Sequence, residues 1–259
     1  MSEETNVILN IVYMICFILF LEMAFPNREL PKVKWWYTRA TVINIAQVCV
    51  AILAGYTWNK WMYGYSVFNL SELYSPIVSG FIAYFSNTFI TYWWHRLRHK
   101  NRYLWRVLHQ LHHSPKRIEI LTSFYKHPIE MMTNSIIGSS VAYLILGINF
   151  EAGAYCIIFA AFGEVFSHSN LKTPYWLGYF YQRPEMHRVH HKRGFHYCNF
   201  SDFPIWDQLF GTFENPKNLQ FEQGFKDDLE NKFFKILRFI DVNPKQKVLL
   251  KKVERSNKE

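Results

Sequence analysis

Long apolar stretches are the feature that most constrains the fold of this chain. A helix needs about 20 predominantly apolar residues to cross the hydrocarbon core of a bilayer. Five stretches reach or approach that length, at residues 6–25, 41–56, 76–94, 129–148 and 150–166. The last two are separated only by a bend near Gly147, as in a helical hairpin. We therefore predict an all-α integral membrane protein with four to five transmembrane helices.

The connections between these stretches alternate between basic and nearly uncharged. Connection 25–40 carries four Lys and Arg residues and connection 95–127 carries eight, whereas connection 57–74 carries only Lys60. Because basic connections stay on the cytoplasmic side of a membrane, we expect the N-terminus outside and the C-terminus in the cytoplasm. The formal net charge of +9 then reflects contact with anionic lipid headgroups, and no nucleic acid partner is expected.

All eleven histidines follow residue 94, and eight of them form three short motifs. The motifs are His95-x-x-x-His99, His109-x-x-His112-His113 and His187-x-x-His190-His191. On a helix, residues three or four positions apart lie on one face, so each motif presents its imidazoles together. Zinc and iron sites use about four to six ligands, so eight imidazoles predict two metal ions. A pH-sensing patch or an adventitious metal binder is the alternative interpretation.

The ligand type narrows the choice of metal. Imidazole suits both zinc and iron, but zinc has no redox function. Neutral imidazoles leave a cationic centre that requires carboxylates nearby. The candidates for that outer role are Glu164, Glu185, Asp202 and Asp207.

At these motifs the chain resembles the fatty acid hydroxylase / sterol desaturase superfamily, whose pattern is HxxxH, HxxHH, a further histidine and a second HxxHH. The resemblance covers about residues 76–216. Residues 183–191 and 199–213 resemble the alkylglycerol monooxygenase-like branch, which reads TPxxHRVHH and NYGxxLxxWDxxFGT. His127-Pro-Ile-Glu130 is similar to the HPxE segment of the family.

The resemblance implies a membrane-bound non-haem di-iron oxygenase that hydroxylates or desaturates a lipid such as a fatty acyl chain, alkyl lipid or sterol. It implies two Fe ions as cofactor and O2 as co-substrate. NAD(P)H-derived electrons would come through a separate donor protein, a reductase, cytochrome or ferredoxin. The expected catalytic residues and metal ligands are the eight motif histidines, and His168 is expected as a further metal ligand.

The same resemblance divides the chain into N-terminal membrane helices over residues 1–75, a catalytic domain over 76–216 and a charged cytoplasmic tail over 217–259. A cytoplasmic helical cap would hold the dinuclear site at the inner face of a bacterial inner membrane or of the endoplasmic reticulum. We expect the tail beyond residue 226 to form a solvated helix or a partly disordered segment.

Several residues depart from the family pattern or stay open. Glu164-x-x-x-His168 stands where the fatty acid hydroxylating member has HxxxH, so a carboxylate joins the metal shell or one ligand is absent. His127 and His196 are further candidates, although helix entry or a supporting hydrogen bond is the simpler role for His127. Asp207 and Asn199 are predicted either to hydrogen-bond ligand imidazoles or, for Asp207, to cap a turn before Gly211.

Two other classes of protein are the alternative interpretations. A zinc-dependent membrane lipid hydrolase would need a glutamate base within its motif, as in HExxH, and neither HxxHH motif contains one. A non-catalytic membrane protein of the same fold, binding metal or lipid, would be favoured by a missing ligand. All three motifs are intact, so an oxidoreductase is the favoured interpretation.

Overall fold

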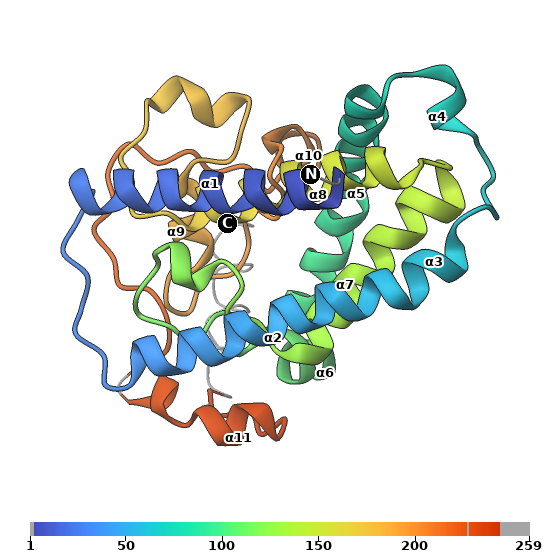
Figure 1. The fold of residues 1–259 in the computed structure, drawn as a ribbon. Helices are drawn as coiled ribbons and strands as arrows, with labels where there is room; N and C mark the ends of the chain where they lie inside the picture. Colours follow the sequence, from blue (N-terminus) through green and yellow to red (C-terminus); the bar gives the residue numbers. More distant parts are fainter. Residues whose placement is uncertain (1–2, 227, 244–259) are drawn as a thin grey trace.

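The computed structural model describes residues 3–226 and 228–243 (Figure 1). Within these residues every regular element is a helix, apart from an isolated bridge between Lys192 and Gln223. The five longest helical segments are α1 (Glu3–Ala24), α2 (Trp36–Tyr56), α5 (Pro76–Lys100), α7 (Pro128–Ser139) continued by η3 (Ser140–Ile145), and α8 (Phe150–His168). The predicted all-α class is confirmed for this part of the chain.

Short helices fill the connections between and after the long ones. The first half contains α3 (Trp58–Met62), α4 (Leu70–Leu73), α6 (Arg102–Leu104), η1 (Trp105–His109) and η2 (Ile120–Thr122). The second half contains η4 (Tyr175–Tyr179), α9 (Pro184–His190), α10 (Pro204–Leu209), η5 (Leu229–Asn231) and α11 (Phe233–Leu237). Proline in the first turn starts α5, α7, α9 and α10, where its missing N–H costs nothing.

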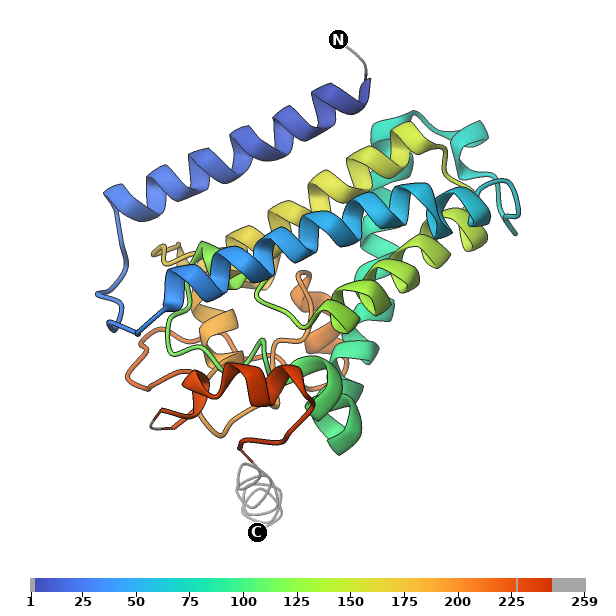
Figure 2. The ribbon, with the colours of Figure 1, turned by 60° about the horizontal axis from the view of Figure 1, so that its bottom comes forward.

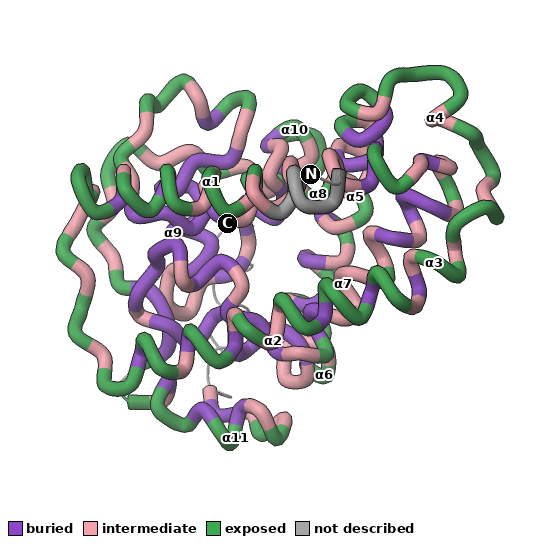
Figure 3. The backbone as a smooth tube through the Cα atoms, in the orientation of Figure 1, coloured by how far each residue is buried: buried purple, intermediate pink, exposed green. Residues whose placement is uncertain are grey.

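Two helical segments of the described chain are long and apolar enough to cross a membrane, Trp36–Met62 and Phe150–His168. Only 22% and 33% of their apolar windows are buried, which is unlike the core helix of a water-soluble domain. Leu9–Ala24 is a shorter apolar helix with exposed side chains such as Phe17 and Phe20. Figure 3 shows α1 and α2 largely exposed, while burial concentrates around α9. By length and composition these exposed apolar helices could cross a membrane, and four to five spans stay a prediction.

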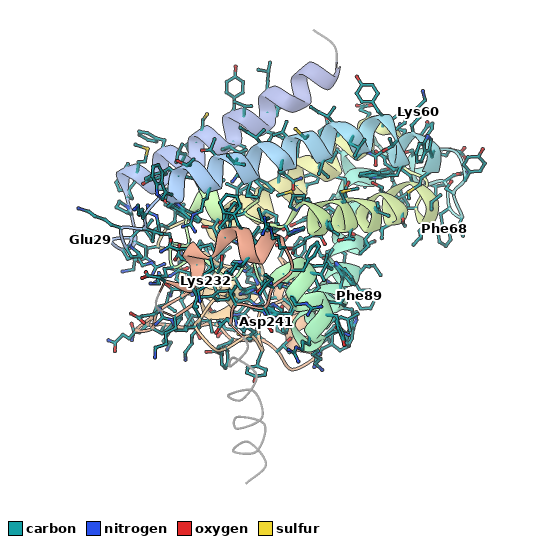
Figure 4. All side chains as sticks on the ribbon, turned by 90° about the horizontal axis from the view of Figure 1, so that it is seen from below. Glu29, Lys60, Phe68, Phe89, Lys232 and Asp241 are labelled. Carbon is teal, nitrogen blue, oxygen red and sulfur yellow. The ribbon has the colours of Figure 1, made fainter. Side chains whose placement is uncertain are left out.

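The segments that connect the long helices lie in two sets, one at each end of these helices. The Asn27 N–H donates to the carbonyl of Asn170 at 2.7 Å, and the Val67 N–H donates to the carbonyl of Leu144 at 2.9 Å. Figure 4 accordingly shows Glu29 at one end of α1 and α2, and Lys60 and Phe68 at the other. Figure 2 shows the long helices α1, α2, α7 and α8 along one side of the molecule, with α6, α9, α10 and α11 on the other.

The central helix pair, α5 and α8, packs at very close range. A Cβ atom on Gly80 would lie 2.5 Å from the carbonyl oxygen of Ala152, so only glycine permits this approach. Helix α1 packs against α8, and α2 packs against α7. Both helices carry histidines toward their C-terminal ends, namely His95 and His99 on α5 and His168 on α8.

The segment 228–243 differs from the solvated or disordered tail that we expected. Phe233 and Ile236 of α11 are buried in the same core as Trp36 of α2, and the ring of Phe233 lies 6.3 Å from that of Tyr125. Glu230 is buried as well and pairs with Arg39 at 3.1 Å. Two apolar side chains three positions apart are too short a pattern to reveal this contact from sequence. Residues 244–259 of the predicted tail lie outside the described part of the chain.

Candidate metal centre

The structure gathers the nine predicted metal ligands into two buried groups. Group 1 consists of His95, His99, His109, His113 and His190, and group 2 of His112, His168, His187 and His191. Within each group, the nitrogens that could bind a metal all lie within 4.8 Å of one another. The histidines come from the last turns of α5, from η1 and the turn that follows it, from the end of α8, and from α9 with the residue that follows it.

Each HxxHH motif contributes to both groups. In the first motif, His109 and His113 belong to group 1 while His112 belongs to group 2. In the second, the outer pair belongs to group 2 and the middle histidine, His190, belongs to group 1. Residues four apart on a helix lie close to one line, whereas the residue between them points away by a large angle. The motif therefore supplies two ligands to one site and one to the next.

The spacing of the imidazole nitrogens fits metal coordination. In group 2, His168 Nε2 lies 3.2 Å from His112 Nε2 and 2.9 Å from His187 Nε2. In group 1, His113 Nε2 lies 3.1 Å from His109 Nε2 and 3.2 Å from His190 Nε2. Two nitrogens bound at right angles to one ion, at bonds of about 2.1 Å, are separated by about 3.0 Å. The nitrogens are thus placed as neighbouring ligands.

The other ring nitrogen of several histidines donates to a fixed acceptor. His95 Nδ1 donates to the carbonyl of Phe200 at 3.0 Å, and His190 Nδ1 donates to that of Cys198 at 2.8 Å. His168 Nδ1 donates to the Glu164 carbonyl at 2.7 Å. Because a carbonyl can only accept, Nδ1 carries the proton and Nε2 presents a free lone pair. These rings are held in the tautomer and orientation that metal binding requires.

The environment also keeps the imidazoles neutral. Burial lowers the pKa of His109, His113 and His187 well below the usual range, and it lowers the pKa of His190 to about 3. Neighbouring histidines add to the effect because two cationic rings would repel each other. A neutral imidazole is the form that binds a metal. The geometry, tautomers and neutral state together fit a resident pair of metal ions.

Glu130 supports this centre, and its role was not foreseen from the sequence. His109 Nδ1 donates to Glu130 Oε1 at 2.8 Å, and the guanidinium of Arg98 forms an ion pair with the same oxygen. Glu130 is fully buried at the start of α7. The sequence signal for this role was the HPxE segment, in which a glutamate follows His127 by three residues at the start of a predicted helix.

The four carboxylates expected in the outer role have other partners. Glu164 accepts from Lys126 Nζ at 2.6 Å, and Glu185 accepts from Thr173 and pairs with Arg183. Asp202 accepts from the Tyr84 hydroxyl. In the described chain, the carboxylate that accepts a hydrogen bond from a histidine ring is that of Glu130. Of the four, Glu164 comes near a ligand ring, with its Oε2 3.8 Å from His168 Nδ1, and the outer role of the four stays a prediction.

Asp207 and Asn199 act on the backbone and not on an imidazole. The Asp207 carboxylate accepts from the Phe200 N–H at 2.9 Å and from the Thr212 hydroxyl at 2.7 Å. Since the Phe200 carbonyl accepts the hydrogen bond from His95 Nδ1, Asp207 supports that ligand indirectly, through the backbone of Phe200. The Asn199 amide donates to the carbonyls of Met186 and Glu214. Both residues shape the loop behind the centre. Of the two roles predicted for Asp207, the structure has the turn before Gly211, since the Thr212 hydroxyl and N–H both donate to Asp207, and not the direct hydrogen bond to an imidazole.

The two remaining histidines lie outside the groups. His127 caps α7 by accepting from the Ile129 N–H at 3.2 Å, which is the helix-entry role. His196 is buried and stacks on His99 with ring centres 5.1 Å apart. Within the described residues its Nε2 has no hydrogen-bond partner. It therefore packs against group 1 without belonging to the set of convergent nitrogens.

A cavity of about 220 Å³ adjoins both histidine groups. His95 and His109 of group 1 line it, and so do His112, His168 and His187 of group 2. Polar side chains supply much of the remaining wall, namely Tyr84, Asn87, Lys126, Asn134, Glu164, Gln182 and Asp202. A molecule bound here would face both groups at once.

A second hollow, of about 350 Å³, lies on the neighbouring face of α5. Its wall is almost entirely apolar, formed by residues such as Phe85, Phe89, Val141 and Trp206. The Trp206 Nε1–H donates to the Thr88 hydroxyl at 3.0 Å, and Thr88 lines the polar cavity. One hydrogen bond thus connects a residue of the apolar hollow with a residue of the polar cavity.

Membrane helices, two buried histidine groups and a shared cavity define a membrane protein with a candidate dinuclear metal site. A family model described as fatty acid hydroxylase matches residues 80–212, which is just over half of the chain. The chain belongs to the fatty acid hydroxylase family. The matched region contains every histidine of both groups.

Curated relatives of several activities are similar to this chain. The very-long-chain aldehyde decarbonylase GL1-9 of Oryza sativa subsp. indica is 30% identical over 52% of this chain and 54% of its own length. The sphingolipid C4-hydroxylase sur2 of Schizosaccharomyces pombe is 29% identical over 55% and 50%. Human alkylglycerol monooxygenase is 28% identical over 61% and 34%, in keeping with the branch that the motifs resemble. The chain spans about half the length of the first two of these relatives, and no solved structure matches it.

Proposed function

We propose that this protein is a di-iron lipid hydroxylase of the membrane. The observation that carries the proposal is the cavity that touches both histidine groups, because a substrate bound there is within reach of two metal ions. Group 1 and group 2 would each hold one iron. Bound iron would supply the activation of O2 that oxidation of an unactivated C–H bond requires. The balanced reaction is R–H + O2 + 2 electrons + 2 H⁺ giving R–OH + H2O, with electrons from a separate donor protein that draws on NAD(P)H.

The residues of this chain prepare the site for that reaction. Glu130 and the carbonyls of Phe200, Cys198 and Glu164 hold the imidazoles in one orientation. Burial of the histidines limits access of water to them, which would protect reactive species from side reactions. A lipid tail would lie in the apolar hollow and enter from the bilayer, past Trp206 and Thr88. Since the cavity itself is polar, the oxidised carbon lies near the polar end of the lipid.

Incubation with isotopically labelled dioxygen tests the reaction. The protein is supplied with iron, reductant and a mixed lipid extract in nanodiscs, and products are analysed by mass spectrometry. We expect one labelled oxygen atom in a product alcohol. An unlabelled alkene formed with oxygen consumption would indicate desaturation instead. Product formation without oxygen and reductant would contradict an oxygenase and favour hydrolysis by a metal-bound water.

We further propose that the centre faces the cytoplasm, because connections 25–40 and 95–127 are basic and connection 25–35 contacts residue 170 near group 2. Single cysteines at the exposed positions Lys217 and Glu72 test this in a variant without the exposed Cys16 and Cys49. An impermeant maleimide should label position 217 only from the cytoplasmic side and position 72 only from the opposite side. Labelling of both from the same side would contradict the five-span arrangement.

A further inference from the structure

One carboxylate in the cavity wall, that of Asp202, belongs to neither histidine group. Asp202 lines the cavity in the loop between α9 and α10. Its Oδ2 accepts from the Tyr84 hydroxyl at 2.8 Å, and that hydroxyl lies 2.8 Å from the hydroxyl of Tyr181. In the part of the chain that the structure describes, Oδ1 receives no hydrogen bond and no cationic side chain pairs with this carboxylate. A half-satisfied acceptor therefore borders the cavity.

Among the described residues that line the cavity, Asp202 is the carboxylate that forms no ion pair. Two cationic side chains line the wall, Arg98 and Lys126. Arg98 pairs with Glu130, and Lys126 Nζ lies 2.6 Å from Glu164 Oε1. Burial raises the pKa of Asp202 to about 7 and the negative charge of Glu164 adds to the shift, whereas the hydrogen bond from Tyr84 and the positive charge of Lys126 oppose it. An unpaired carboxylate in such a place is costly, and a cation that enters the cavity would relieve that cost.

The position of Asp202 relates it to the metal centre. A Cβ atom on Gly163 of α8 would lie 2.4 Å from Asp202 Oδ2, so the carboxylate rests directly against the α8 backbone. His168 of group 2 lies on the same helix. Five residues of α-helix rise by about 7.5 Å. A ligand group at Asp202 is therefore separated from group 2 by the length of a few carbon–carbon bonds.

We propose that Asp202 binds the ammonium group of an amine-bearing lipid and so holds a carbon a few bonds from the nitrogen beside the two histidine groups. The reaction at that carbon rests on the proposed function, whereas the binding does not. Asn87, whose side-chain oxygen lacks a donor among the described residues, adds a second acceptor to the wall for a hydroxyl on the same headgroup. The tail of the lipid would continue into the apolar hollow.

Binding without turnover tests this site. Metal-loaded protein in nanodiscs, kept anaerobic and without reductant, is titrated with a long-chain primary amine and with its N-acetylated, neutral counterpart. A charge-assisted hydrogen bond predicts a preference for the amine of about 10- to 100-fold in Kd. Asp202→Asn keeps the shape and an acceptor for Tyr84 but removes the charge, so the preference should disappear. Glu222→Gln, at an exposed carboxylate 75% accessible in its side chain, is the matched control and should keep the preference.

The comparison of the two lipids uses the wild-type protein, so it tests the proposal even if a variant does not fold. Equal affinity for both lipids would overturn the proposal, as would an unchanged preference in Asp202→Asn. Loss of metal from Asp202→Asn with an intact preference would assign the carboxylate to balancing the metal charge, and would also overturn it. An amine preference without any labelled alcohol in the oxygen experiment would refute the hydroxylase and leave the ammonium site standing.

Discussion

Replacement of His187 or His190 by alanine is expected to remove about one metal ion per chain from a protein that otherwise carries about two. The two histidines lie on the same short helix, but His187 belongs to group 2 and His190 to group 1. Each change therefore empties a different site and leaves the other. Because histidines of both groups line the shared cavity, loss of either ion should raise the barrier to turnover by about 4 kcal/mol, which slows the reaction about 1,000-fold.

Elemental analysis of purified protein measures this result, with thermal unfolding recorded alongside. His127→Asn is the matched control, since it changes a buried histidine that caps α7 and asparagine is itself a good cap. It should keep both ions. Full metal content in both alanine variants would contradict the two-group assignment. Zinc in place of iron would not, because zinc binds more tightly than ferrous iron to a given nitrogen site.

The sequence predicted the long helices well because their signal is local. Each of the five apolar stretches forms a helix, and the bend near Gly147 is real, with Gly147 at a positive φ of 63°. The number of membrane spans is harder to predict because α5 carries polar residues along the cavity, such as Asn87 and Thr91. A helix that lines an active site is less apolar than one that faces lipid only.

The histidines were also predictable, since i, i+3 and i+4 spacing is a property of one helix. Their division into two groups was not, because it depends on how α5, α8 and α9 cross. The carboxylate that bonds to a histidine ring was missed for the same reason. Asp207 is close in sequence to the second HxxHH motif, yet its partner is the Phe200 N–H. Glu130 is 21 residues from His109, and only the packing of α7 brings the two together.

Glu130 is the residue whose loss should disturb both stability and metal binding. Its carboxylate is completely buried, and it pairs with Arg98, whose side chain is 6% exposed, and with His109. Removing one partner of a buried ion pair leaves the other charge without compensation, which costs about 3–5 kcal/mol. The same change frees the His109 ring, and loss of such a partner typically lowers metal affinity or activity by about 10- to 100-fold.

Glu130→Gln separates the two effects when it is compared with Glu119→Gln. Glu119 is also a buried carboxylate paired with an arginine, Arg117, but it contacts no histidine in the described structure. Both variants should lose stability toward thermal unfolding, because each leaves a guanidinium unpaired. Only Glu130→Gln should release metal at chelator concentrations that the wild-type protein withstands, and the ion lost should be that of group 1. Equal metal retention by the two variants would show that Glu130 acts only as a structural partner of Arg98. Selective release would show that the carboxylate acts through His109 on the metal, as its hydrogen bond to Nδ1 predicts.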